Sequence, residues 1–142
     1  MHVFTMPADT WDELNPDKQA ILHLIHKHRA CVYRLTKLKN YYVGQHEILN
    51  ESDRENRLVC NHAKDISDTA SSYFIGEPVV YKSDQDINCL LDALENAGAD
   101  EADGDNGLDL SIYGRAYEYI YTAEDETNQV IKNLSPESTF VV

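Results

Sequence analysis

The sequence predicts an α+β fold with three long helices, one short helix and a small, mainly antiparallel sheet near the C-terminus. Two observations support this prediction. Residues 1–98 are mainly helical in pattern, because apolar side chains recur there at three- and four-residue steps. Residues 99–142 hold an acidic stretch and then short segments in which apolar and polar side chains alternate, which is typical of strands. A chain of 142 residues is about the size of one domain.

The first long helix is expected to start between Thr10 and Asp17 and to end before Gly44. Thr10 and Glu13 match a capping box, and residues 15–17 (Asn-Pro-Asp) offer a second start with proline at the first helical position. Gly44 can adopt a positive φ just past the last turn. The expected apolar stripe of this helix consists of Ile21, Leu24, Ile25, His28, Val32, Leu35, Leu38 and Tyr42.

A polar connection, residues 45–55, is expected to be anchored by Ile48 and Leu49 before a second long helix begins. Gly76 and Pro78 are expected to end that helix. Residues 79–81 (Val-Val-Tyr) then predict a short strand. The apolar side of the second helix is expected to comprise Leu58, Val59, His62, Ala63, Ile66, Ala70, Tyr73 and Phe74.

A third helix is expected to be capped by Ser83 or Asp84 and to close at Gly98. The residues that follow, 97–107 (AGADEADGDNG), predict an acidic loop. The apolar side of the third helix comprises Ile87, Leu90, Leu91 and Leu94.

The C-terminal part predicts a short helix and three strands. The short helix is expected at about 107–113, with Gly114 at its end. Residues 115–122 and 129–134 predict two strands joined by a polar turn, and residues 139–142 predict a third strand. Alternation places three tyrosines on one face of the first strand: Tyr117, Tyr119 and Tyr121.

The formal net charge of −13 is unevenly distributed along the chain. Residues 1–64 carry nine Lys/Arg and eight Asp/Glu, whereas residues 65–142 carry three Lys/Arg and seventeen Asp/Glu. The acidic half is expected to repel a phosphate backbone, so the charge distribution disfavours direct DNA binding by it. Because there is neither an apolar run of about 20 residues nor a secretory leader, we expect a cytoplasmic protein without a membrane span.

The sequence assigns no catalytic, cofactor-binding or metal-binding residue. The motifs of hydrolases, P-loop proteins and dinucleotide-binding proteins do not occur, so we expect no enzyme and no cofactor. A calcium loop is the weaker alternative for the acidic stretch, but its bidentate position falls on Ile112. The donors in that alternative would be Glu101, Asp103, Asp105, Gly107 and Asp109.

Histidines, cysteines and tyrosines are each open to an ordinary interpretation. His23 and His26 are expected to be partly exposed helical residues, and His62 to be packed. The three cysteines all fall in expected helices, where buried thiols in a reducing compartment are favoured over an intermolecular disulfide or a reactive thiol: Cys31, Cys60 and Cys89. The nine tyrosines suit an interface core or the margin of an ordinary core equally well.

Four motifs in a fixed order resemble those of the portal proteins of tailed bacteriophages, in the subfamily of long-tailed phages of Gram-positive bacteria. The first is YYxG followed by HxI, at residues 41–48. The second is NRLVxNxAKxIxDTxxxYxxGxPV, at residues 56–79. The third is SIxGxAYEYxY at residues 111–121, and the fourth is the closing NLSPESTFVV at residues 133–142.

The resemblance implies that residues 1–142 are the N-terminal part of a portal wing domain, without the clip, stem and crown regions. A portal subunit belongs to a homo-oligomeric ring of about twelve copies at one capsid vertex, built in the host cytoplasm and kept in the virion. Its implied partners are capsid and scaffold proteins, the terminase and the head–tail connector. DNA would pass through the channel of the full ring without binding this part directly.

Two other functions remain open on the sequence alone. One is a free-standing acidic helical module that binds a protein partner, and the other is the calcium-binding protein considered above. The apolar closing residues TFVV would leave a sheet edge unpaired, so the chain is expected to be cut short.

Overall fold

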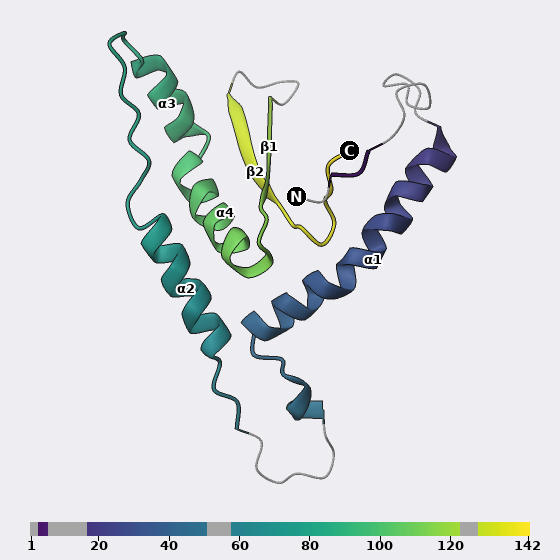
Figure 1. Ribbon diagram of the computed structural model, residues 1–142. Helices are drawn as coiled ribbons and strands as arrows, with labels where there is room; N and C mark the ends of the chain where they lie inside the picture. Colours follow the sequence, from purple (N-terminus) through teal and green to yellow (C-terminus); the bar gives the residue numbers. More distant parts are fainter. Residues whose placement is uncertain (1–2, 6–16, 51–57, 123–127) are drawn as a thin grey trace.

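The computed structural model describes residues 3–5, 17–50, 58–122 and 128–142 (Figure 1). It confirms the α+β prediction, with four α-helices and a two-stranded antiparallel sheet near the C-terminus of the described part. In chain order the elements are α1 (Lys18–Tyr42), the 3₁₀ turn η2 (Glu47–Asn50), α2 (His62–Phe74), α3 (Asn88–Asn96), α4 (Ala99–Tyr113), β1 (Tyr117–Thr122) and β2 (Gln129–Leu134).

The helices form two arms that diverge from a common end (Figure 1). One arm is α1, and the other is made of α2, α3 and α4, with the β1–β2 hairpin between the arms. Helix α4 is central, because it contacts the three other helices and both strands. Helix α1 meets α2 and α4 where the arms converge.

Helix α1 has the length that its apolar stripe predicts, 25 residues. Asp17 is its N-cap and accepts a hydrogen bond from the Gln19 amide at 3.1 Å. Gly44 has a φ of 80° just past the last turn, as expected for a glycine that reverses the chain there. The alternative starts at Thr10 and at residues 15–16, with Glu13, lie outside the described residues.

Helix α2 begins later than its apolar side predicts. Asn61 has φ −83° and ψ 64°, and its side chain accepts a hydrogen bond from the Lys64 amide, so the helix starts at His62. Leu58 and Val59 therefore precede the helix. Its expected apolar side is largely open to solvent, with Ile66, Tyr73 and Phe74 exposed by 69%, 94% and 70%.

The prediction of a strand at residues 79–81 is wrong, because this segment has no strand partner among the described residues. The expected caps of the third helix are also wrong. Ser83 Oγ accepts a hydrogen bond from the Gln85 amide in a local turn, and Asp86 Oδ1 accepts one from the Asn88 amide at 3.0 Å. The chain turns twice before it can enter α3, which therefore starts at Asn88.

The acidic stretch is a helix and not a loop. Gly98, with a φ of 71°, ends α3 as predicted and at once starts the 15-residue α4. Asp100 and Glu101 occupy the first turn of α4, where the helix dipole favours negative charge. Gly107 faces α2, and a Cβ there would lie 2.6 Å from Ile75 Cδ1. Close packing on α2 thus stabilises a helix whose composition favours a loop.

The sheet is a hairpin of β1 and β2, in which Tyr117 pairs with Leu134 and Thr122 pairs with Gln129. Strand β2 has the predicted bounds, and β1 starts two residues later than predicted. The rings of Tyr119 and Tyr121 stack with centroids 5.4 Å apart, which confirms that they share a face.

The expected third strand at residues 139–142 is wrong. Val141 forms only an isolated parallel bridge with Val3, and the Phe4 amide donates to the Val141 carbonyl at 3.2 Å. The aromatic rings explain this placement, because Phe140 packs between Phe4 at 5.5 Å and His28 at 5.0 Å. These contacts draw the segment towards α1 and away from the hairpin.

The buried core is small and lies where α1 and α4 face the C-terminal segment. Leu24 and Leu35 are 2% exposed, and Ala102, Pro136 and His28 are also buried. Many large apolar side chains of the described residues lie outside this core, among them Leu58 at 85% and Val80 at 73% exposure.

Three smaller expectations concern thiols, the connection after α1 and membranes. The expectation of buried thiols is wrong: Cys31 is half-buried, Cys60 lies before α2, and Cys60 and Cys89 are exposed. Ile48 and Leu49 lie in η2, where Ile48 is half-buried and Leu49 is 39% exposed. No described helix combines the length and apolar character that a bilayer crossing requires.

Candidate functional site

The first two motifs meet where α1 ends and α2 begins. Tyr42 donates its hydroxyl hydrogen to Asp68 Oδ1 at 2.9 Å, and Lys64 Nζ donates to the Tyr42 oxygen at 3.1 Å and to Asp68 Oδ2 at 2.7 Å. Asn61 Nδ2 donates to the Tyr42 carbonyl at 2.8 Å. We call these four residues, Tyr42, Asn61, Lys64 and Asp68, the Tyr42 cluster.

The contacts of the Tyr42 cluster favour the charged forms of Lys64 and Asp68. The hydrogen bond to Asp68, with a further bond to the Tyr42 hydroxyl, raises the pKa of Lys64 above its ordinary value. The same Lys64 bond lowers the pKa of Asp68, and the Tyr42 hydroxyl lowers it further. The Lys64 ammonium also lies 4.7 Å from the centre of the Tyr42 ring. All four groups therefore hold the two helices together around neutral pH.

The polar contacts of the fourth motif with α1 are made by Glu137, beside the Phe140 ring that packs on His28. The Glu137 carbonyl lies 2.9 Å from His28 Nε2, Glu137 Oε1 accepts from Thr36 Oγ1 at 2.8 Å, and Glu137 Oε2 accepts from Lys39 Nζ at 3.0 Å. The Lys39 hydrogen bond lowers the pKa of Glu137, and the Glu137 bond raises the pKa of Lys39. We call these four residues, His28, Thr36, Lys39 and Glu137, the Glu137 cluster.

The third motif connects to the second and to the hairpin. Ser111 Oγ donates to the Ser67 carbonyl of α2 at 3.2 Å. Asn106 Nδ2 donates to Glu118 Oε2 at 2.9 Å, and Asn133 Nδ2 donates to Asn106 Oδ1 at 2.8 Å. Asn106 thus ties α4 to both strands. The four motifs that are far apart in sequence form one contact network.

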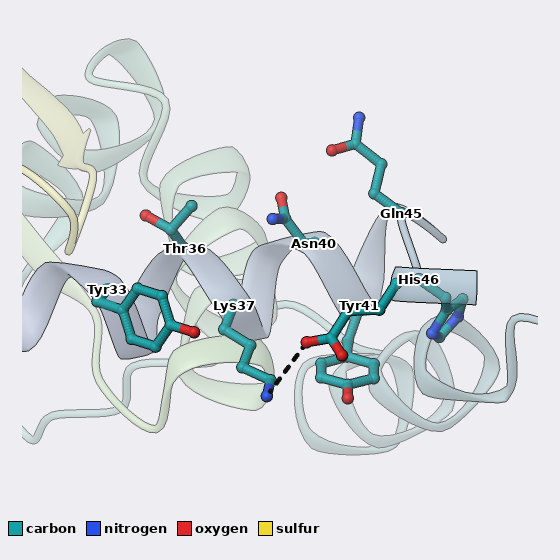
Figure 2. Close-up of a pocket in the computed structure, with 8 residues that line it drawn as sticks. Tyr33, Thr36, Lys37, Asn40, Tyr41, Gln45 and His46 are labelled. Atoms are coloured by element: carbon teal, nitrogen blue, oxygen red, sulfur yellow. Dashed lines mark ion pairs between the residues drawn. The ribbon is translucent and has the colours of Figure 1, made fainter. Parts of the chain in front are cut away.

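A small hollow lies beside the first motif, at the C-terminal end of α1 (Figure 2). Its volume is about 130 Å³. Lys37 Nζ lies 3.6 Å from Glu47 Oε1, and the dashed line at Lys37 in Figure 2 marks this ion pair. The His46 ring packs edge-on against Tyr41 at 5.2 Å, and its Nε2 is buried with no hydrogen-bond partner among the described residues. The remaining lining residues are Tyr33, Thr36, Asn40 and Gln45.

The helical conformation of α4 changes the interpretation of the acidic donors. Residues two apart on an α-helix are about 200° apart around its axis, so Glu101, Asp103 and Asp105 do not converge as in a calcium loop. Within the described ranges, no group of three His, Cys, Asp or Glu side chains could hold a metal ion. His23 and His26 are exposed, as expected, whereas the expectation that His62 is packed is wrong because it is exposed.

Large apolar side chains are exposed on every described helix. Helix α1 exposes Leu22 and Tyr33 by 54% and 76%, and α3 exposes Leu90 by 52%. Large exposed apolar side chains on several elements are a feature of surfaces that pack against other proteins. The network described above orients these faces relative to one another. The geometry therefore suits a rigid part that docks against other protein surfaces.

Residues 21–142 match the family described as phage portal protein, SPP1 Gp6-like. The chain belongs to this family of phage portal proteins. Portal proteins are structural proteins of the virion that occupy the capsid vertex and serve DNA packaging. No curated protein matches the chain. The portal match includes all four motifs and every residue of the Tyr42 and Glu137 clusters.

Sequence reasoning found the portal motifs but not their contacts. Asn61, Lys64 and Asp68 occur in the second portal motif at i, i+3 and i+7, which places them near one side of a helix. That spacing was a usable signal for a polar contact to another element. Glu137 gave no such signal, because its partners lie 98 to 109 residues away in sequence.

Proposed function

We propose that this chain is part of the wing region of a portal subunit, of the subfamily found in long-tailed phages of Gram-positive bacteria. Residues 1–98 supply the mainly helical part, and residues 99–142 supply the acidic helix and the hairpin. The observation that carries the proposal is the portal match over residues 21–142. Within it the first motif contacts the second, the second contacts the third, and the third pairs with the fourth.

In the proposed assembly about twelve subunits form a ring at one capsid vertex. The ring is built in the bacterial cytoplasm and then remains in the virion, where the terminase and the head–tail connector dock on it. The exposed apolar faces of α1, α2 and α3 support contacts with capsid and scaffold proteins and with neighbouring subunits. DNA would pass through the ring channel without binding this part, because residues 65–142 carry three Lys/Arg against seventeen Asp/Glu.

The proposed role is structural and not catalytic. The polar side chains of the motifs act within the chain: Tyr42 and Glu137 each join elements that are distant in sequence. Such clusters fix the relative positions of helices. This is what a subunit needs when its contacts repeat around a ring.

Native mass spectrometry and negative-stain electron microscopy of the full-length subunit that contains this chain test this function. We expect closed rings of about a dozen copies, since repeated heterologous contacts close into rings when the rotation permits. A protein that stays monomeric across the accessible concentration range would contradict the portal-ring proposal and favour an acidic module that binds a different protein. Calcium titration by calorimetry tests the remaining alternative, a calcium-binding protein, which would release or absorb heat at millimolar calcium.

A further inference from the structure

All Lys, Arg, Asp and Glu positions of helix α1 are basic, and its solvent-exposed side also carries Leu22 and Tyr33. The helix carries six Lys/Arg and no Asp/Glu. Lys37 and Lys39 pair with Glu47 and Glu137 inside the chain. The other four basic residues form no ion pair within the described part of the chain: Lys18, Lys27, Arg29 and Arg34. Exposed Tyr33 lies one turn after Arg29 and next to Arg34.

The opposite arm carries a hollow with the complementary character, which we call the acidic groove. Its volume is about 270 Å³, and it lies between the segment after α2 and the α3–α4 corner. Helices α3 and α4 together hold seven Asp/Glu and no Lys/Arg. The lining of the acidic groove includes three apolar residues, Val79, Leu91 and Leu94, which we call its floor, and three acids, Glu95, Asp100 and Asp103, which we call its rim.

The basic face and the acidic groove cannot meet within one copy of the chain. Helix α1 forms one arm in Figure 1, and the segment after α2 lies on the far side of the other arm, with α4 and the hairpin between them. None of the three rim acids forms an ion pair with any described residue. Two complementary surfaces on opposite sides of a molecule form a head-to-tail contact between copies.

We propose that the exposed face of α1 in one copy packs into the acidic groove of the next copy. This inference rests on the proposed ring and names the two surfaces that build it. Tyr33 and Leu22 would cover the apolar floor, while Arg29 and Arg34 face the rim acids, in the manner of an amphipathic helix in a groove. Complementary charge would fix the register of the contact and exclude a head-to-head arrangement, in which like charges oppose each other.

A protein partner is favoured over nucleic acid as the occupant of the α1 face. Phosphate binding requires a surface whose surroundings are also basic, whereas this chain has a net charge of −13. The second copy offers both the acidic rim and an apolar floor for Tyr33, which a DNA backbone does not.

Charge reversal on each surface and then on both tests the contact, with self-association measured by sedimentation velocity at physiological salt. Arg29→Glu with Arg34→Glu, and separately Glu95→Lys with Asp103→Lys, are each expected to weaken association about tenfold or more. Combining all four substitutions in one chain restores attraction with the signs exchanged, so association recovers. The matched control, Asp65→Lys with Asp105→Lys, changes charge equally outside the acidic groove and should leave association unchanged. Circular dichroism of each variant confirms that it remains folded.

The outcomes separate this inference from the function on which it rests. Rings that form normally in both reversed variants would overturn the head-to-tail contact and leave the portal-ring proposal standing. A protein that never self-associates would overturn both. If the α1 reversal abolishes binding of a short DNA duplex without changing self-association, the α1 face is a nucleic-acid surface and the inference is wrong.

Discussion

The phenolic oxygen of Tyr42 lies 2.9 Å from Asp68 Oδ1, across the junction between α1 and α2. Tyr42 is the last residue of α1 and Asp68 is in the middle of α2, so this bond fixes the angle at which the second helix leaves the first. Lys64 Nζ donates to the Tyr42 phenolic oxygen and to the other carboxylate oxygen, Asp68 Oδ2, so that the three side chains form a closed set of hydrogen bonds. The tyrosine of the first portal motif is thus hydrogen-bonded to two residues of the second motif.

Tyr42→Phe should loosen the junction without unfolding the protein. The substitution removes the hydroxyl that donates to Asp68 and accepts from Lys64, while the ring and its packing remain. We expect faster amide hydrogen exchange in the first turns of α2 and a small fall in Tm. Tyr73→Phe is the matched control, because Tyr73 is 94% exposed, and it should change neither quantity. Unchanged exchange in the Tyr42 variant would show that the junction does not depend on the hydroxyl.

Asn61→Ala should be more costly than Tyr42→Phe. Asn61 caps α2 by accepting from the Lys64 amide and also donates to the Tyr42 carbonyl, so alanine removes both bonds. Loss of such a cap reduces the free energy of unfolding by about 1–2 kcal/mol. Urea denaturation measures the change, and Asn96→Ala, at the exposed end of α3, serves as the control. A loss no larger than that of the control would contradict the capping role.

Stability should fall in acid because of the Glu137 cluster. The Lys39 hydrogen bond lowers the folded-state pKa of Glu137 below its ordinary value of 4.5, against the opposing effect of burial. The group therefore contributes stability that is fully present above about pH 4.5 and is lost as pH falls through the lower folded-state pKa. Thermal unfolding between pH 7 and pH 3 should show a smaller acid loss in Glu137→Gln than in the unmodified protein. If both proteins lose the same stability between pH 7 and pH 3, Glu137 is not a source of the acid sensitivity.

The Glu137 cluster should also lose stability at alkaline pH, because Lys39 then loses its charge. Glu137 raises the pKa of Lys39 above 10.5, so its contribution is present below that pH and is lost as pH rises through the folded-state value. Lys39 is half exposed, so the effect is screened by salt and small. Lys39→Met, which keeps an apolar stem, should remove the alkaline loss in low salt. If Lys39→Met loses as much stability at alkaline pH as the unmodified protein, the loss comes from other titrating groups.

Two glycines of α4 should respond to alanine with opposite signs. At Gly107 the new Cβ would lie 2.6 Å from Ile75 Cδ1, so packing between α4 and α2 must shift, at a cost of about 1–3 kcal/mol. At Gly104 no atom lies within 4 Å of a Cβ, so alanine should stabilise the helix by about 0.5–1 kcal/mol. Urea denaturation of both variants decides the point. Ile75→Val, which removes the opposing methyl group, should recover part of the Gly107→Ala loss, and an absence of recovery would contradict this contact.

Elements with strong local signals could be predicted from the sequence, as α1 and β2 show. Asp17, the apolar stripe and Gly44 all specify α1, and the bounds of β2 follow from alternation and the flanking turn. Helix α4 could not be predicted over its full length, because two glycines and many acids favour a loop. It is helical because Gly107 and Ala102 allow close approach of other elements, and this is a tertiary effect.

The sequence was sufficient to predict which motifs make up the candidate site, but not which of their residues are in contact. The order of the motifs pointed to portal proteins, yet nothing local indicated that Tyr42 meets Asp68 or that Glu137 meets Thr36. Ile66 and Tyr73 lie on the predicted apolar side of α2, and both are exposed to solvent. Periodicity reveals that a face is apolar and does not reveal whether its neighbour belongs to the same chain.

The Glu137 cluster also sets the order of events during synthesis. Helix α1 leaves the ribosome early, but the carboxylate that fixes it lies 98 to 101 residues later. Until that turn emerges, α1 is held at its C-terminal end by the Tyr42 cluster, while His28 and Thr36 lack their partners. The position of α1 is therefore completed only after Glu137 has been synthesised.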